Sequence, residues 1–244
     1  MPLSPNFGER RGGLLPEFVV LHYTAMESCK AAMARLCDPA SEVSAHYLID
    51  YDGTVHALVP EAARAWHAGA GQWRGLDDLN SRSIGVELAN DGAEPFAAPQ
   101  MAALERLLAG IMGRWGIEPA AVIGHSDMAP GRKFDPGARF DWRRLARSGL
   151  SVWPDEMALA RPEGHFAAAK THDAFADALR AFGYPVPPDL AAGSALAISL
   201  LDTFRKRFRP GAGFGAGRPV EPADILIAQN LAMRFGVEHG PLNA

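Results

Sequence analysis

The chain has 244 residues, which is enough for one or two globular domains. Apolar residues make up 48% of it and charged residues 21%, a balance that excludes a highly charged disordered chain. The formal net charge of -4 argues against a general nucleic-acid-binding protein, because such proteins usually carry a basic excess.

Apolar runs and helical spacing predict strands that alternate with helices over the first 154 residues. In chain order these elements are a strand at 18–23, a helix at 28–37, strands at 45–50 and 55–59, a strand at 83–89, a helix at 100–115 and a strand at 121–124. Ser28 is placed to cap the first helix, and Asp52–Gly53 is a strong hairpin signal. This order predicts an α/β domain over residues 1–160.

Two segments of this domain lack a periodic apolar pattern. Residues 69–80 are rich in glycine, tryptophan and polar residues, so we expect a long loop there. Residues 129–140 contain two prolines and two glycines and predict an ordered loop directly after the last strand.

The composition changes after Trp153–Pro154, and residues 161–164 are typical of a linker. Three amphipathic patterns follow, each with apolar residues on one helical face. These faces are Phe175, Leu179 and Phe182; then Leu196, Leu200, Phe204 and Phe208; then Ile227, Leu231 and Phe235. We expect a small three-helix domain over residues 164–240.

The two cysteines, Cys29 and Cys37, fall in the predicted helix at 28–37. Eight helical positions span about 12 Å. A disulfide requires Cα atoms about 4.4–6.8 Å apart. We therefore expect two free thiols.

Two of the eight histidines stand out by their positions. His22 and His125 each end a predicted apolar strand, where a side chain can project from a rigid sheet into a cleft. Asp135 follows in the loop after His125. Two imidazoles and one carboxylate are sufficient ligands for a catalytic zinc ion, although this spacing alone is not diagnostic.

Glu87 and Lys133 are the other candidates for chemistry. In the strand at 83–89, Glu87 lies on the face opposite to that of its apolar neighbours, and glutamate is unfavourable within a strand. A carboxylate buried there would need a partner or a function, whereas a solvent-facing sheet would explain it equally well. Lys133 is two residues from Asp135, so its ammonium group could reach the same cleft or simply lie on the surface.

Six segments together resemble the type-2 family of zinc N-acetylmuramoyl-L-alanine amidases. In the family's order they are VVLHYTA (19–25), VSAHYLI (43–49), AWHAG (65–69), WRG with LN (73–75 and 79–80), SIGVEL (83–88) and GHSDMAPGRKFDPG (124–137). The last segment is the most specific, since it contains a histidine, the lysine and the aspartate of the family's site in one stretch.

The resemblance implies a central mixed β-sheet flanked by helices, with zinc in a groove on one face. It implies that His22, His125 and Asp135 bind Zn²⁺. Glu87 matches the family's catalytic glutamate, and Lys133 matches the lysine that stabilises the transition state. The implied reaction is hydrolysis of the lactyl–L-Ala amide bond in peptidoglycan or in (anhydro)muropeptides during cell-wall turnover and recycling.

Five residues are candidates for the walls of a substrate groove, and core packing is the alternative for each. They are His46, Trp66, His67, Trp73 and Asn80. Trp73 lies in the glycine-rich loop, where an exposed ring could stack on a sugar, whereas His46 lies in a strand and is the more structural of the five. We expect Asp127 to form hydrogen bonds within its own loop and not to bind metal.

The C-terminal helices resemble the peptidoglycan-binding domain that follows some of these amidases, through LRAFGY (179–184) and FRKRFRP (204–210). This order is similar to the broad-specificity, lipid-anchored bacterial amidases, and the cytoplasmic anhydro-muropeptide amidases are a competing comparison. The N-terminus does not have the pattern of a signal peptide, and no stretch approaches the roughly 20 apolar residues of a membrane span. We expect a cytoplasmic protein, or a periplasmic or outer-membrane-associated one if a leader was removed.

Three other functions stay open. The same fold can serve a non-catalytic peptidoglycan receptor, which typically lacks a zinc ligand. A zinc peptidase would cut within the stem peptide instead of at the lactyl group. The C-terminal helices could also bind a protein partner.

Overall fold

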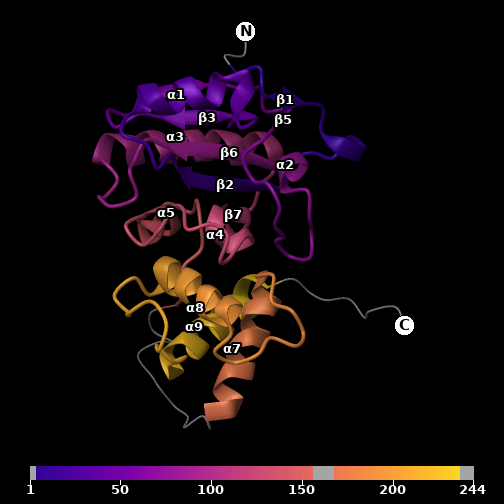
Figure 1. Cartoon of the computed structure of the whole chain (residues 1–244), viewed down its shortest axis with the longest axis vertical. Coiled ribbons are helices and arrows are strands. Elements are labelled where there is room, and N and C mark those ends of the chain that lie inside the picture. Colours follow the sequence, from indigo (N-terminus) through magenta and orange to yellow (C-terminus); the bar gives the residue numbers. More distant parts are fainter. Residues whose placement is uncertain (1–3, 156–167, 237–244) are drawn as a thin grey trace.

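The computed structural model describes residues 4–155 and 168–236. The predicted linker at 161–164 and the limits of the two predicted domains at 160, 164 and 240 lie outside these ranges. Within the described ranges the chain forms a sheet with helices on both faces, and the C-terminal helices lie beyond one edge of the sheet (Figure 1). The α/β fold with a central mixed sheet is confirmed.

The central sheet has five strands in the order β4-β3-β6-β2-β7. The bounds are β2 Phe18–Tyr23, β3 Tyr47–Ile49, β4 Val55–Ala57, β6 Ser83–Leu88 and β7 Val122–Gly124. β3, β6, β2 and β7 run parallel, and β4 pairs antiparallel with β3 at the edge. All five predicted strands are present, and β3 and β4 are shorter than predicted.

Alternate side chains of the strands enter two separate apolar clusters. On β3, Ile49 packs with α3 (Ala98–Trp115), whereas its neighbour Leu48 packs with α1 (Cys29–Cys37). Because successive side chains of a strand point to opposite faces, the two helices cover opposite faces of the sheet. This double cover explains why the inner strands are apolar throughout, as in other parallel sheets.

The first predicted helix begins as expected. Ser28 is its N-cap, and the Ser28 hydroxyl accepts a hydrogen bond from the backbone N–H of Ala31. Cys29 and Cys37 are free thiols, which confirms that prediction.

Three C-terminal helices match the predicted patterns: α7 Ala168–Phe182, α8 Ala195–Phe208 and α9 Pro222–Phe235. Their buried faces join the same apolar cluster as α3 and the sheet. An ion pair between Arg205 and Asp224, with both side chains fully buried, ties α8 to α9. That these helices form a separate domain stays a prediction.

The shortest elements were not predicted. β1 (Phe7–Gly8) pairs antiparallel with β5 (Arg64–Ala65), and each has two residues. The short helices are α2 Leu79–Arg82, α4 His125–Met128 and α5 Trp142–Arg147, with 3-10 turns at Arg11–Gly13, Pro39–Ser41 and Pro119–Ala121. In the described part of the chain, each helix is too short or too polar to traverse a lipid bilayer.

Candidate active site

The candidate site is built where parallel strands end. His22 of β2 lies directly opposite Glu87 of β6 in the strand register. β7, on the other side of β2, ends at Gly124, and His125 is the next residue. Since the carboxyl ends of parallel strands meet at one edge of a sheet, the topology gathers these three side chains.

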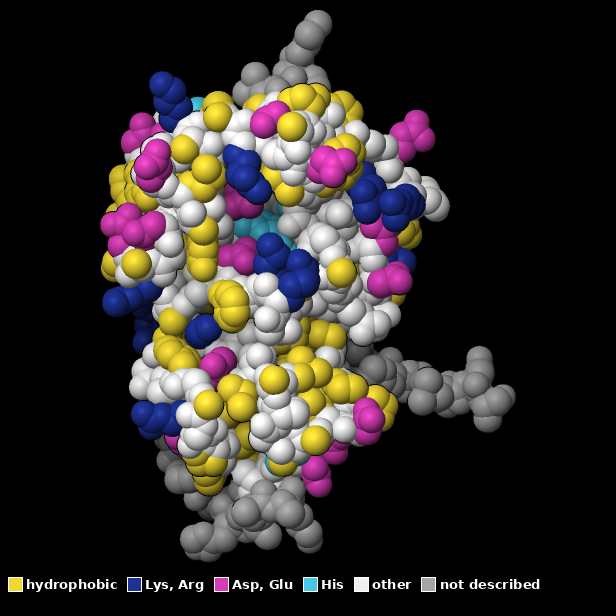
Figure 2. Space-filling view, viewed as in Figure 1, with side chains coloured by type: hydrophobic (Ala, Val, Ile, Leu, Met, Phe, Trp, Pro, Cys, Tyr) yellow, Lys and Arg dark blue, Asp and Glu magenta, His cyan; other side chains and the backbone are white. Residues whose placement is uncertain are grey.

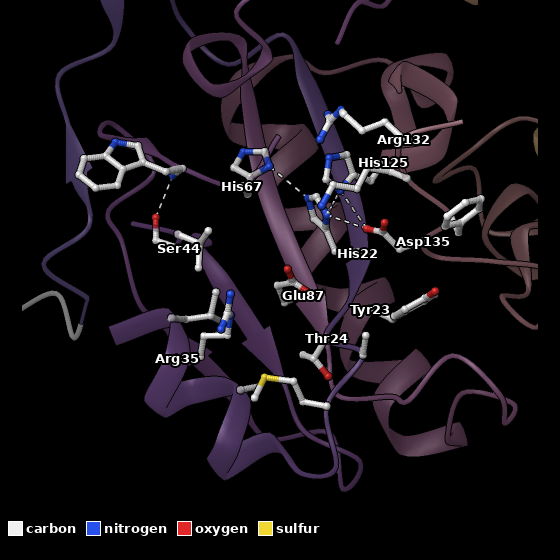
Figure 3. Close-up of a pocket in the computed structure, with 18 residues that line it drawn as sticks. His22, Tyr23, Thr24, Arg35, Ser44, His67, Glu87, His125, Arg132 and Asp135 are labelled. Atoms are coloured by element: carbon white, nitrogen blue, oxygen red, sulfur yellow. Dashed lines mark hydrogen bonds and ion pairs between the residues drawn. The ribbon is translucent and has the colours of Figure 1, made fainter. Parts of the chain in front are cut away.

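His22, His125 and Asp135 form a compact buried cluster (Figure 3). The Nδ1 atom of His22 lies 2.9 Å from Nδ1 of His125 and 2.9 Å from Oδ2 of Asp135. The third pair, Nδ1 of His125 and Oδ2 of Asp135, is 3.1 Å apart. The structure therefore brings together the three residues predicted to bind metal.

The outer nitrogens of both histidines have acceptors. His125 Nε2 lies 2.8 Å from the carbonyl oxygen of Ala68 and donates to it. His22 Nε2 lies 3.1 Å from Nδ1 of His67, whose own Nε2 faces the Ser83 hydroxyl at 3.3 Å. With each Nε2–H donating outward, both Nδ1 atoms carry a lone pair instead of a proton.

These outward hydrogen bonds leave three acceptor atoms facing one another, namely Nδ1 of His22, Nδ1 of His125 and Oδ2 of Asp135. Burial, and then the nearby His125, lower the pKa of His22 to about 4, so its imidazole is neutral at pH 7. Two imidazole nitrogens and a carboxylate oxygen that face one another are the ligand set of a catalytic zinc site, and outward hydrogen bonds of this kind orient histidine ligands in such sites. The residues present thus fit a zinc ion.

Glu87 lies beside this cluster at the floor of a pocket of about 410 Å³. Its side chain is partly buried, and its Oε2 atom has no hydrogen-bond partner among the described residues. Burial, and next the Asp135 carboxylate, raise the pKa of Glu87 to about 8, against the effect of Lys133. A carboxyl group with a pKa near neutrality is suited to both accept and donate a proton.

Basic side chains lie on two sides of the pocket mouth, with histidines and acidic side chains at its base (Figure 2). Lys133 and Arg35 line the pocket, and neither makes an ion pair with a described residue. Arg132 also lines it, but its guanidinium donates to the carbonyl oxygens of Ala68 and Ala70. The pocket thus favours a ligand with negative or partly negative oxygen atoms.

Two of the five predicted groove residues line the pocket, namely Trp66 and His67. His46 is fully buried outside the pocket, which agrees with the structural role that its strand position favoured and not with a place in the groove wall. Its Nδ1 accepts the backbone N–H of Gly85, and its Nε2 donates to the carbonyl oxygen of Ala63. His46 therefore holds the sheet next to His67.

Asn80 and Trp73 are also absent from the pocket wall, and both predictions are corrected. The Asn80 amide oxygen accepts the backbone N–H groups of His67 and Ala68, which fixes the segment behind the cluster. The Trp73 side chain is 0% exposed, because rings of the C-terminal segment cover it. Phe182 and Tyr184 contact it edge-on, with ring centroids 5.7 Å and 5.0 Å away.

Several features of the site have little local signal in the sequence. Arg35 lines the pocket, but no motif around it predicts this; Phe134 also lines it, and its position between Lys133 and Asp135 was a signal in the sequence. Gly85 is different, because a Cβ atom there would lie 2.4 Å from Cγ of the His67 ring. A glycine inside an apolar strand indicates such a close approach, so this signal was present in the sequence.

Asp127 hydrogen-bonds within its own segment, as predicted, since its Oδ2 accepts the backbone N–H of Gly124 at 2.8 Å. It also accepts hydrogen bonds from two residues far along the chain. Tyr184 donates to Oδ1 at 2.6 Å, and Arg207 donates to Oδ2 at 2.5 Å.

Comparison with known proteins agrees with this geometry. Residues 12–138, more than half of the chain, match the N-acetylmuramoyl-L-alanine amidase family. The chain is 36% identical over 213 residues to the N-acetylmuramoyl-L-alanine amidase AmiD of Escherichia coli, covering 79% of this chain and 74% of that protein. It is 39% identical over 103 residues to the 1,6-anhydro-N-acetylmuramyl-L-alanine amidase AmpD of the same organism, covering 42% of this chain and 56% of AmpD.

Two solved structures extend the likeness to the C-terminal helices. The complex of Escherichia coli AmiD with anhydro-N-acetylmuramic acid-L-Ala-D-γ-Glu-L-Lys matches with a TM-score of 0.79 and 31% identity, over 96% of this chain and 99% of AmiD. AmpDh3 of Pseudomonas aeruginosa with an anhydromuramic pentapeptide matches with a TM-score of 0.80 and 31% identity, over 97% of each chain. The chain therefore belongs to the type-2 N-acetylmuramoyl-L-alanine amidase family of enzymes.

Proposed function

We propose that this chain is a zinc-dependent amidase that hydrolyses the lactyl–L-Ala bond of muropeptides, including their anhydro forms. The observation that carries the proposal is the convergence of three proton-free acceptors beside Glu87, on the floor of a pocket. The substrate class is inferred from AmiD and AmpDh3, whose structures hold anhydromuramoyl peptides.

His22, His125 and Asp135 would hold the zinc ion. When bound there, zinc supplies a Lewis acid that polarises a carbonyl group and lowers the pKa of water. The outward hydrogen bonds to Ala68 and His67 keep both imidazole rings in the orientation that presents Nδ1. These contacts supply the rigidity that a metal site requires of its surroundings.

Glu87 is the proton carrier in this account. Its Oε2 atom takes a proton from the attacking water as the new C–O bond forms at the lactyl carbonyl carbon. It then delivers that proton to the alanine nitrogen as the C–N bond breaks. An amide requires this second step, because an unprotonated amide anion is too basic to leave.

Lys133 and the pocket walls complete the arrangement. The Lys133 ammonium lies at the pocket wall, where it can stabilise negative charge that develops on the carbonyl oxygen. Trp66 and His67 also line the pocket, and in this account they contact the sugar and the first peptide residues.

Hydrolysis in H₂¹⁸O of an anhydromuramoyl tripeptide tests the assignment of the bond. The proposal predicts one ¹⁸O atom in the lactyl carboxylate of the sugar product and an unlabelled intact peptide with a free alanine amine. A zinc peptidase would instead place the label in the carboxylate of a stem-peptide residue that is still attached to the sugar. Binding without any cleavage, with zinc present, would indicate a receptor.

A further inference from the structure

The C-terminal helices reach directly into the segment that carries His125. Arg207 of α8 donates to Oδ2 of Asp127 at 2.5 Å, and Tyr184, which follows α7, donates to Oδ1 at 2.6 Å. The side chains of Arg207 and Asp127 are each 2% exposed. Losing one partner of a buried ion pair leaves an uncompensated charge, so this contact strongly constrains both elements.

Arg207 also contacts the first residue of the neighbouring strand. Its second amino group donates to the carbonyl oxygen of Val122 in β7 at 3.0 Å. Its guanidinium lies over the Trp142 ring, 4.2 Å from the centroid. One side chain of α8 therefore binds both the first residue of β7 and the helix α4 that follows this strand.

Asp127 transmits this contact to two members of the acceptor cluster. It lies in α4, the four-residue helix whose first residue is His125. Its Oδ2 accepts the backbone N–H of Gly124, the residue before His125, at 2.8 Å. The backbone N–H of Ser126 donates to the backbone carbonyl of Asp135 at 2.9 Å, so a shift of α4 moves both His125 and Asp135.

A second set of contacts joins the C-terminal segment to the loop that follows Ala68. The backbone N–H of Arg74 donates to the carbonyl oxygen of Gly183 at 2.8 Å, and the Arg74 guanidinium donates to that of Phe235 at 2.8 Å. This loop runs on from Ala68, the acceptor of His125 Nε2. The C-terminal segment thus contacts both α4 and the loop that follows Ala68.

We propose that Arg207 and Tyr184 are positioning residues of the metal centre, and that the C-terminal helices are a structural part of that centre through Asp127. This inference rests on the proposed function for the identity of the centre. On this proposal the helices are more than an appended wall-binding module. Without them, α4 loses Arg207 and Tyr184, the partners of Asp127 that set its position relative to β2.

The test compares conservative variants of Arg207 and Tyr184 with a conservative variant of Arg205, another buried arginine of α8. Arg207→Lys and Tyr184→Phe weaken the contact to Asp127, and Tyr184→Phe removes only one hydroxyl group. Arg205→Lys is the matched control, because Arg205 is also fully buried and ion-paired in α8 but binds Asp224 of α9. Circular dichroism would verify that each variant is folded before metal binding is measured.

We expect Arg207→Lys and Tyr184→Phe to weaken zinc affinity about 10–100-fold in chelator competition, as residues that orient ligands do. The visible absorption spectrum of the cobalt-substituted protein should also change, since it reports ligand geometry. Arg205→Lys should leave both readouts near those of the wild type. Wild-type affinity and spectrum in both test variants, or an equal loss in Arg205→Lys, would overturn the proposal.

These readouts separate this inference from the proposed function. If the wild-type chain binds zinc but cleaves no muropeptide, the proposed function fails while the affinity comparison still decides the role of Arg207. If the chain cleaves and all variants bind zinc equally, only the positioning role fails.

Discussion

The surroundings of Glu87 disfavour the ionised form of its carboxyl group. It is partly buried on β6, its Oε2 lacks a partner among the described residues, and its pKa is raised to about 8 by burial first and by Asp135 second. Glu87→Gln should lower kcat about 10²–10⁴-fold, because the amide can neither take nor deliver the proton. Metal analysis should find zinc retained, and near-normal turnover would exclude the assigned role.

Lys133 tests the electrostatic part of the mechanism. Replacing it with methionine keeps the length of the side chain and removes the charge, so kcat should fall roughly 10²–10³-fold with zinc still bound. Lys30→Met is a suitable control, since Lys30 is exposed on α1 away from the pocket. Equal rates in the two variants would remove Lys133 from the mechanism.

At the scale of single residues, much of the site could be predicted from the sequence. The sequence predicts two histidines, the glutamate, the lysine and the aspartate as site residues, and all five line one pocket in the structure. The wall residues were harder, since burial is set by the whole fold. Trp73 is covered by rings more than 100 positions later in the chain, and no local pattern around it predicts that.

At the scale of elements, Gly85 determines how closely β6 approaches the segment of His67. A Cβ atom at this position would lie 2.4 Å from the His67 ring, so Gly85→Ala should destabilise the protein by about 1–3 kcal/mol. Gly113 of α3 has open space around it, and Gly113→Ala should stabilise by roughly 0.5–1 kcal/mol. Chemical denaturation of the metal-free variants measures both, and equal effects at the two sites would refute the close-approach argument.

Glu61 links β3 to the end of α3 and makes that junction sensitive to pH. Burial alone would raise the pKa of Glu61, but hydrogen bonds from Arg114, Tyr47 and Trp115 lower it to about 2. Because the folded-state pKa lies below the unfolded value near 4.5, the stabilisation is complete above that pH and is lost as the pH falls toward 2.

The melting temperature of Glu61→Gln should therefore lie below that of the wild type at neutral pH. The gap should shrink as the pH falls below about 4.5, for as long as both proteins remain folded. A difference in melting temperature that does not change with pH would show that the ionisation of Glu61 does not contribute to the stability of this junction.

Length decided which elements could be predicted. The 18-residue α3 and the six-residue β2 and β6 carry enough apolar positions for a clear period. The two-residue strands β1 and β5 and the four-residue α4 carry too few. Asp127 of α4 binds Arg207 of α8, and a contact between residues so far apart leaves no local signal at α4.

At the scale of the whole molecule, the C-terminal helices and the sheet share one apolar cluster and a buried ion pair. The sequence predicted the helices but not this contact, because Asp127 and Arg207 are 80 positions apart. Pairing over such distances depends on tertiary packing that no local pattern contains. A prediction of two domains does not say which residues of one contact the other.

The central claim is that this chain hydrolyses muropeptides with a metal held by His22, His125 and Asp135. The most direct test strips the purified protein of metal, incubates it with an anhydromuramoyl tripeptide, and repeats the incubation after zinc is restored. The account predicts no cleavage without metal and release of the free sugar and the intact L-Ala-peptide with zinc, identified by mass spectrometry. Equal cleavage in the stripped protein, or none after zinc has bound, would contradict it.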